Sequence, residues 1–317
     1  MARRRRPTPV PGPSEARGLE EATRKRLLWT VAALLAVAGL AWFLLAGDGG
    51  PPSGEVGYTP VSDFQDVHGL AVDPERPGLL YIATHHGLIR AENGTAFARV
   101  GDLQDDYMGF TAHPTEGGLF WVSGHPIGGG NMGVRKSTDG GFTWQQLGLG
   151  GIADFHAMTI SPADPDRLWG FFRGEVQRSD DGGRTWTIAG RPPQPVLSLT
   201  AHPADASTVY GATQSGLLIS QDGGASWMAA KEGVHTALAI HPASPQTWYA
   251  ARPDGIERTT DGGGSWQRTA LDVAGTVGYL ALHPEDPQTL YAATYQTGLY
   301  RSTDGGVSWA VLKPPSR

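Results

Sequence analysis

An eight-residue segment recurs five times at a nearly constant interval, and this repetition constrains the fold more than any other feature of the chain. The copies are STDGGFTW, SDDGGRTW, SQDGGASW, TTDGGGSW and STDGGVSW, and each ends in Trp. The five closing Trp residues lie 42, 41, 39 and 43 residues apart. A sixth, degenerate copy, RAENGTAF, ends at Phe97. Self-similarity at such a period is typical of proteins built from stacked or radially arranged units.

Each copy sits in the same wider frame of short apolar segments. An apolar run ends at a proline, often as His-Pro, and a short aromatic strand follows it. A third strand leads into the copy, and the closing Trp opens a fourth. Four short strands in a unit of about 42 residues predict a β-propeller blade. We therefore expect an all-β, six-bladed β-propeller over residues 60–317.

The D-G-G core of each copy suits a tight turn. Gly takes positive φ without steric cost, and the Asp side chain can accept hydrogen bonds from backbone N–H groups of the turn. Trp has the size to wedge between neighbouring sheets, and loss of one is expected to cost roughly 3–5 kcal/mol. The Asp and Trp of each copy are therefore assigned structural roles: Asp139, Trp144, Asp181, Trp186, Asp222, Trp227, Asp261, Trp266, Asp304 and Trp309.

This pattern resembles the BNR/Asp-box repeat family, S/T-x-D-x-G-x-T/S-W, over residues about 60–317. Members include sialidases and other glycosidases, sortilin-type sorting receptors and the photosystem II assembly factor. The strings D-V-H-G-L, T-H-H-G-L and D-F-H-A also resemble a bacterial propeller family usually labelled glycosylhydrolase-like. The resemblance implies a propeller and leaves the function open, because one fold carries many unrelated activities.

Upstream of the repeats, residues 27–46 form an apolar run of twenty residues without a charge. As a helix this run would span roughly 30 Å, the thickness of the hydrocarbon layer of a membrane. Basic residues precede it directly, which orients the N-terminus toward the cytoplasm. We expect a basic cytoplasmic tail (1–26), one transmembrane helix (27–46), a flexible linker (47–59) and an extracytoplasmic propeller at the cell membrane. Cleavage as a signal peptide is the alternative.

Charge and cysteine content narrow the function. The chain carries −6 overall, and its first 26 residues carry +5, which leaves −11 for the rest. An acidic body does not resemble a nucleic-acid-binding protein, so no nucleic-acid partner is expected. The absence of Cys excludes disulfides, thiolate metal sites and Cys nucleophiles.

The ten histidines divide between the two faces of the predicted propeller. The eight-residue copies, here called boxes, should all lie on one face. That face should also hold the histidines that repeat with the blade, as hydrogen-bonded turn residues: His113, His202, His241 and His283. The other histidines do not repeat and fall in loops of the opposite face, here called the rim: His68, His85, His86, His125, His156 and His235. Five of these six belong to the first three blades, as expected for a site in a repeat protein.

The innermost strands of a propeller line its central channel, so residues near their starts should meet at one mouth. Three pairs are expected there: Asp66 with His68, Asp106 with Met108, and Asp154 with His156. The candidate ligand-binding rim consists of His68, His85, His86, Tyr107, Met108, His125 and His156.

Three functions compete for this rim. Histidines with carboxylates suit Zn or Cu, and the candidate ligands of such a divalent metal are His68, His125, His156 and Asp106. Glycoside hydrolysis needs two carboxylates roughly 5–10 Å apart, for which the candidates are Asp66, Asp106, Asp154 and Glu175. A true sialidase is not expected, since the chain lacks the F/Y-R-I-P motif and an arginine triad.

The third function is a platform for an extracytoplasmic protein or glycan partner. In that case the rim histidines would be part of the interface. They could also serve only to fill the channel with hydrogen bonds, with no ligand at all.

Overall fold

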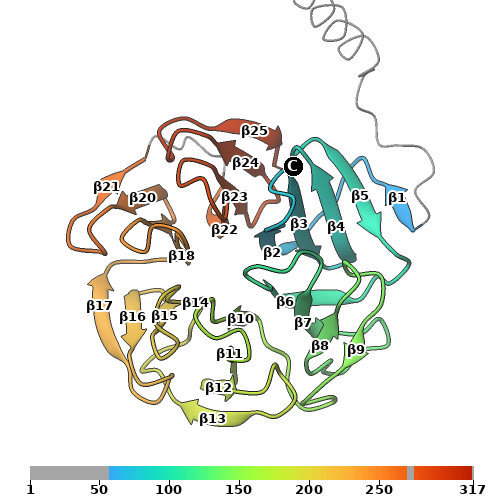
Figure 1. Ribbon diagram of the computed structural model, residues 1–317, viewed down its shortest axis with the longest axis horizontal. Coiled ribbons are helices and arrows are strands. Elements are labelled where there is room, and N and C mark those ends of the chain that lie inside the picture. Colours follow the sequence, from blue (N-terminus) through green and yellow to red (C-terminus); the bar gives the residue numbers. More distant parts are fainter. Residues whose placement is uncertain (1–56, 270–274, 316–317) are drawn as a thin grey trace, which may run out of the picture. The chain divides into compact units, whose positions relative to one another are not determined.

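The computed structural model describes residues 57–269 and 275–315, and the regular structure in this part of the chain is all β. Six antiparallel sheets are arranged around a central channel, as expected of a six-bladed β-propeller (Figure 1). The predicted tail, the transmembrane helix over residues 27–46 and the linker up to residue 56 lie outside the described residues. Among the residues that are described, no helix is long and apolar enough to cross a membrane.

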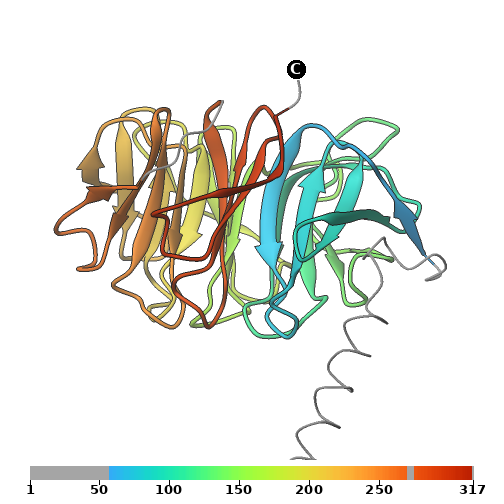
Figure 2. The same cartoon turned by 90° about the horizontal axis from the view of Figure 1, so that it is seen from above.

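Each blade is a meander of four consecutive strands, called A to D from the channel outward, and Figure 2 shows them from the side. Blade 1 contains β2 (Val67–Val72), β3 (Leu79–Thr84), β4 (Gly87–Glu92) and β5 (Ala96–Val100). Blade 2 contains β6 (Asp106–Ala112), β7 (Phe120–His125), β8 (Arg135–Ser137) and β9 (Gln145–Gln146). Blade 3 contains β10 (Ala157–Ile160), β11 (Leu168–Phe172), β12 (Glu175–Ser179) and β13 (Thr187–Gly190).

The second half of the ring repeats this plan. Blade 4 contains β14 (Ser198–Ala201), β15 (Val209–Ala212), β16 (Gly216–Ser220) and β17 (Met228–Glu232). Blade 5 contains β18 (Ala237–Ile240), β19 (Trp248–Arg252), β20 (Gly255–Thr259) and β21 (Gln267–Arg268). Blade 6 contains β22 (Val277–Leu282), β23 (Leu290–Thr294), β24 (Leu299–Ser302) and β25 (Ala310–Lys313).

The ring closes without exchanging a strand between its first and last blades. The remaining strand, β1 (Tyr58–Pro60), pairs with β5 as a fifth strand on the outer edge of blade 1, so the range predicted as a flexible linker (47–59) contains part of a strand. At the junction of blades 1 and 6, the ammonium of Lys313 lies 2.9 Å from Asp63 Oδ1 and 5.0 Å from the centre of the Phe64 ring. Closure therefore depends on side-chain packing and one ion pair.

Six apolar clusters fill the six spaces between neighbouring blades. Each box Trp joins the cluster between its own blade and the preceding one, and Phe97 takes this place in blade 1. The box Trp residues are only partly buried, however. The indoles of Trp121 and Trp169, in the B strands of blades 2 and 3, are almost fully buried.

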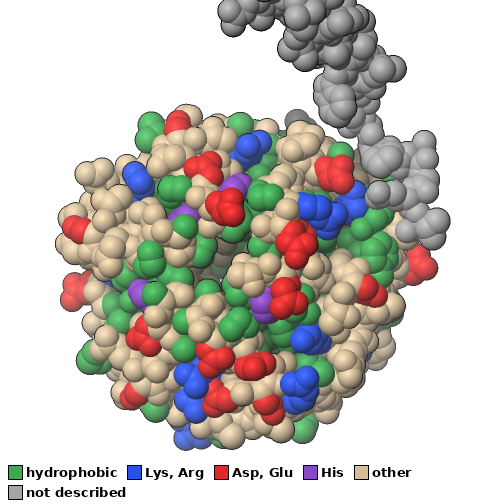
Figure 3. Space-filling model, in the orientation of Figure 1, with side chains coloured by type: hydrophobic (Ala, Val, Ile, Leu, Met, Phe, Trp, Pro, Cys, Tyr) green, Lys and Arg blue, Asp and Glu red, His purple; other side chains and the backbone are tan. Residues whose placement is uncertain are grey.

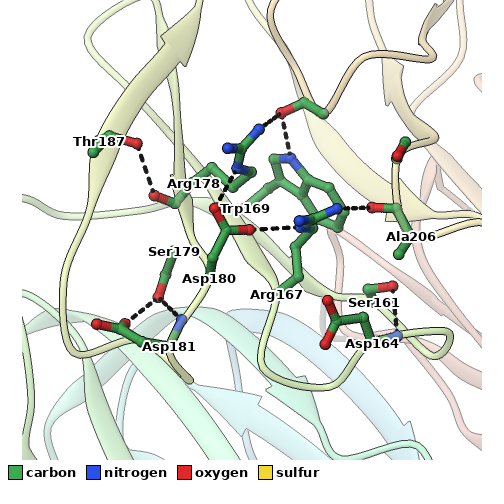
Figure 4. A network of polar contacts seen from close by, with 12 residues as sticks. Ser161, Asp164, Arg167, Trp169, Arg178, Ser179, Asp180, Asp181, Thr187 and Ala206 are labelled. Atoms are coloured by element: carbon green, nitrogen blue, oxygen red, sulfur yellow. Dashed lines mark hydrogen bonds and ion pairs between the residues drawn. The ribbon is translucent and has the colours of Figure 1, made fainter.

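The box turn is closed by its own side chains, as blade 3 illustrates (Figure 4). Ser179 Oγ donates to Asp181 Oδ1 over 2.8 Å and accepts a hydrogen bond from the amide of Gly183. Asp181 also accepts hydrogen bonds from the amide and the hydroxyl of Thr185, and the latter bond lowers the pKa of Asp181 to about 2. Equivalent bonds close the boxes at the other four aspartates: Asp139, Asp222, Asp261 and Asp304.

Backbone hydrogen bonds tie each box to the A–B turn of its own blade. The first Gly of each box donates its amide to a carbonyl of that turn, for example Gly182 to Asp166 over 2.8 Å. In the degenerate box of blade 1, Asn93 takes this role at a φ of 49°. The four repeated histidines lie in the same turns, where each Nδ1 accepts a backbone amide, as expected. Figure 3 shows the face seen in Figure 1, hollowed at its centre with His side chains around the opening.

Burial of the indoles leads to a prediction about stability. Trp169 is fully buried, and its Nε1 donates to the carbonyl of Gly223 in the box of blade 4 over 2.9 Å. We expect Trp169→Ala to lower the free energy of unfolding by about 3–5 kcal/mol, and Trp186→Ala, at a partly buried position, by less. Urea denaturation measures both. The exposed Ile188 is the control, since Ile188→Ala should change it by less than about 0.5 kcal/mol. Equal midpoints for the Trp169 and Ile188 variants would contradict this assignment.

Candidate functional site

The rim mouth of the channel brings together side chains from blades 1, 2 and 3. Two of its residues, His68 and Met108, lie at irregularities in the innermost strands, where the pairing of β2 with β3 and of β6 with β7 shifts by one residue. Such bulges remove a residue from the ladder and re-aim its side chain. Both side chains line a cavity at this mouth.

Blade 3 contributes Asp154 and His156, which reach the mouth because their backbone passes close to that of blade 2. The segment 154–156, which leads into β10, passes directly over β6 and β7. Ser123 Oγ accepts a hydrogen bond of 2.9 Å from the amide of Phe155, and a Cβ on Gly109 would lie only 2.3 Å from the Phe155 carbonyl oxygen. Gly at position 109 is therefore required for Asp154 and His156 to reach the mouth.

The first group of polar side chains consists of His68, His85 and Asp106. His68 Nε2 lies 2.9 Å from His85 Nδ1, and Asp106 Oδ1 lies 3.2 Å from His85 Nδ1 and 3.7 Å from His68 Nε2. Bonds of about 2.0 Å to a tetrahedral ion place its ligand atoms about 3.3 Å apart, so the three separations bracket the value for a metal site. Asp106 Oδ1 is buried and accepts no hydrogen bond from the described residues.

The second group consists of His125, Asp154 and His156. Asp154 Oδ2 lies 3.1 Å from His125 Nε2 and 2.8 Å from His156 Nε2. One ligand atom from each residue lies within 4.8 Å of the others, as in the first group. The other carboxylate oxygen, Asp154 Oδ1, is buried without a hydrogen-bond partner among the described residues.

The hydrogen bond of His125 assigns its tautomer. Nδ1 lies 2.9 Å from the carbonyl oxygen of Gly130, and a carbonyl only accepts, so Nδ1 carries the proton. In the neutral ring Nε2 then has a lone pair, and Nε2 lies 3.1 Å from the carboxylate oxygen Asp154 Oδ2. The contact is repulsive unless a proton or a cation lies between the two atoms. A backbone carbonyl that fixes the remote nitrogen in this way is typical of metal-binding histidines.

The environment shifts the proton affinities of these groups in different directions. Burial lowers the pKa of His68 to about 4, so the ring is neutral at physiological pH. Burial also raises the pKa of Asp106. The hydrogen bond with Asp154 raises the pKa of His156. The two groups also influence one another, because charges on His125, Asp154 and His156 act on Asp106.

A cavity of about 380 Å³ lies beside the two groups. His68 from the first group and Asp154 and His156 from the second group line it. Its remaining lining comes mostly from apolar and aromatic side chains and one arginine: Met108, Phe171, Phe172, Arg173, Val196, Leu197 and Tyr279. The channel itself continues below it, lined by the A strands of all six blades.

The metal ligands predicted from the sequence are therefore distributed over two groups rather than gathered in one. His68 and Asp106 belong to the first group, where the third member is His85. His125 and His156 belong to the second, where the third member is Asp154. The sequence predicted one set of ligands and the structure contains two groups, because the spacing of residues in the sequence does not show which residues of different blades lie close together.

Several other candidates lie outside both groups. Tyr107 is buried, with its ring 5.2 Å from that of Trp144, because side chains alternate along β6 and its neighbour Asp106 faces the mouth. Asp66 is exposed, and Glu175 is paired with Arg191. His86 is exposed beside His85.

His235, also predicted on the rim, is a buried structural residue. Its Nε2 lies 2.8 Å from Glu257 Oε1, and its Nδ1 lies 2.7 Å from the Gly233 carbonyl oxygen. Sequence reasoning also overlooked Arg173 as a lining residue of the cavity. The available signal was its position in the B–C turn of blade 3, outside the set of arginines that recur in the third strand of the blades: Arg90, Arg178, Arg258 and Arg301.

Comparison with known proteins supports the fold and no more. The GH74 enzyme of Niastella koreensis is 16% identical, with a TM-score of 0.59 over 80% of this chain and 46% of that chain. The GH74 xyloglucanase from Xanthomonas campestris is 19% identical, with a TM-score of 0.54 over 80% of this chain and 46% of that chain. YCF48 bound to D1 peptide is 14% identical, with a TM-score of 0.51 over 84% of this chain and 90% of that chain.

This chain thus spans less than half the length of each GH74 enzyme. No family model and no curated protein matches it. Identities this low indicate a shared β-propeller fold, and they leave the activity to be argued from the site.

Proposed function

We propose that this protein is a metal-binding propeller whose rim holds divalent transition-metal ions, Zn²⁺ or Cu²⁺, on the two His/Asp groups. The contact of His125 carries this proposal. Its Nε2 lies 3.1 Å from Asp154 Oδ2, and His156 Nε2 lies 2.8 Å from the same oxygen. A metal cation would turn this repulsive contact into coordination by three ligands.

The donor set fits such ions. Two imidazoles and one carboxylate are intermediate between hard and soft ligands, which suits Zn²⁺ and Cu²⁺ better than Ca²⁺ or Mg²⁺. Three protein ligands leave at least one coordination position open, as in zinc sites that bind a further molecule. The cavity of about 380 Å³ beside both groups provides room for that molecule. The proposed role is therefore binding of a metal together with a small ligand.

Metal titration tests this function. We expect the full-length protein, stripped with EDTA, to take up two Zn²⁺ or Cu²⁺ ions per chain in equilibrium dialysis. His68→Ala with Asp106→Asn should abolish one site, and His125→Ala with His156→Ala should abolish the other. Loss of ligands should weaken binding by more than the about 10- to 100-fold that loss of an outer partner costs.

The matched control is His86→Ala, which removes an exposed histidine from the same turn as His85 but from neither group. It should leave both sites intact. A wild-type protein that takes up no metal, or double variants with unchanged stoichiometry, would refute the proposal.

A glycosidase-like hydrolase is the second candidate. The five box turns support assignment to the BNR/Asp-box repeat propellers, and the fold is similar to that of GH74 enzymes. Asp106 and Asp154 both lie at the rim mouth, and charge on Asp154 acts on Asp106. Most glycoside hydrolases need a pair of carboxyl groups at the scissile bond, and these two aspartates could supply that pair.

Hydrolysis of xyloglucan and of chromogenic glycosides tests this candidate. If the carboxylates act as acid and base, Asp106→Asn and Asp154→Asn should each abolish turnover, and EDTA should leave it unchanged. Glu175→Gln, at a carboxylate paired with Arg191, is the control and should retain activity. Turnover that survives both Asp substitutions would exclude this mechanism.

Anchoring to a membrane is a separate part of the proposal. The uncharged run over residues 27–46 and the basic residues before it support a single span with the propeller outside the cytoplasm. The full-length chain should remain in the membrane fraction after carbonate extraction, and a chain without residues 1–46 should not. Protease added to intact cells or spheroplasts should degrade the propeller. A full-length chain found in the soluble fraction would contradict the anchor.

A further inference from the structure

The lining of the cavity at the rim mouth combines two chemical kinds of side chain. Polar groups come from the imidazole and carboxylate groups of His68, Asp154 and His156. The apolar and aromatic lining consists of Met108, Phe171, Phe172, Val196, Leu197 and Tyr279. The volume of about 380 Å³ falls within the range of small-molecule sites, which join apolar linings to a few placed polar groups. A ligand that fits this lining has a polar group and an apolar body.

Arg173 supplies a cation at the edge of this cavity. It occupies the turn between β11 and β12 with a φ of 51°, a conformation that non-glycine residues seldom adopt. Its guanidinium lies 4.9 Å from the centre of the Phe172 ring. Arg173 is exposed, so this cation–π contact leaves its N–H donors accessible to a ligand.

No carboxylate among residues 57–269 and 275–315 forms an ion pair with Arg173. Two other arginines in loops or at strand ends of the rim face are paired: Arg191 with Glu175, and Arg252, at the end of β19 in blade 5, with Asp254. A guanidinium that lines a cavity without such an ion pair is suited to bind an anion from outside the chain.

Metal binding would make the charge at this mouth more positive. Each divalent ion would add a charge of +2 at this mouth, beside the guanidinium of Arg173. The metal-loaded mouth therefore favours an anionic ligand more than the metal-free mouth does.

We infer that the cavity binds an organic carboxylic acid with an apolar or aromatic body. The carboxylate would pair with Arg173 and the metal-loaded His/Asp groups, and the body would lie against Phe171, Leu197 and their apolar neighbours. This inference rests on the metal binding proposed above and adds the class of the second ligand. The same chemistry occurs in a free organic acid and in the C-terminal residue of a peptide.

Calorimetric titration of the metal-loaded, full-length protein tests the inference. N-acetylphenylalanine should bind, and its amide, N-acetylphenylalaninamide, should bind at least about tenfold more weakly because it lacks the charge. Arg173→Gln keeps the backbone position and removes the cation. It should weaken binding of the acid by about 10- to 100-fold. EDTA-stripped protein should bind the acid more weakly than the loaded protein, since the two ligands are thermodynamically coupled.

Controls separate this inference from the metal proposal. Arg191→Gln removes an arginine that is paired elsewhere in blade 3 and should leave acid binding unchanged. Arg173→Gln should take up as many metal ions as the wild type. A peptide with a C-terminal Phe that binds as well as N-acetylphenylalanine would identify a peptide end as an acceptable source, and failure of the peptide would restrict the site to free acids.

Three results would overturn the inference. They are a metal-loaded wild type that does not bind the acid, equal affinities for acid and amide, and equal affinities of the wild type and Arg173→Gln. In each case the metal titration would still stand. A protein that takes up no metal and binds no acid would overturn both proposals.

Discussion

Every sheet of this protein has apolar side chains on both faces, and covering them requires a neighbour on each side. A single four-stranded blade cannot remove both faces from water, so the sheets stack around an axis until the last covers the first. The six clusters between blades are the result. The channel, the faces and the position of the rim site all follow from this closed arrangement.

The two faces of the ring differ in role: the box face carries repeated structural hydrogen bonds, and the rim carries the candidate site. On the box face, backbone amides of the box turns bond to the A–B turns, and side chains such as Ser179 and Asp181 close each turn. Indoles such as Trp169 reach across to the next blade. The turn bonds repeat within each blade, and the indoles of Trp121 and Trp169 link blade 2 to blade 3 and blade 3 to blade 4. Loops on the rim do not form these repeated hydrogen bonds. Their side chains can therefore differ from blade to blade and together form a site.

The fold could be predicted because its signals are local and repeated. Box turns, apolar strands and a period near 42 residues all indicate the same architecture. Assignment of the repeat histidines to turns and of the other histidines to the rim also follows from strand direction, and His235 shows its limit, since a rim position does not imply exposure.

The grouping within the site could not be predicted. His125 and Asp154 meet only because Gly109 permits a close backbone approach, and His68 reaches the mouth from a bulge. Tyr107 is buried while its neighbour Asp106 faces the mouth, because successive side chains of a strand point to opposite faces. The role of Arg173 depends on a cavity that six different segments of the chain line together.

The closure of the ring has a consequence for how such a chain can be rearranged. Blade 1 and blade 6 are each built from one continuous segment, and the extra strand β1 lies on the outer edge of blade 1 instead of completing blade 6. A circular permutant opened at any loop between a D strand and the next A strand therefore still encodes six whole blades. Duplication or deletion of one such segment changes the blade count without leaving an incomplete sheet, so this architecture can gain or lose units as intact modules.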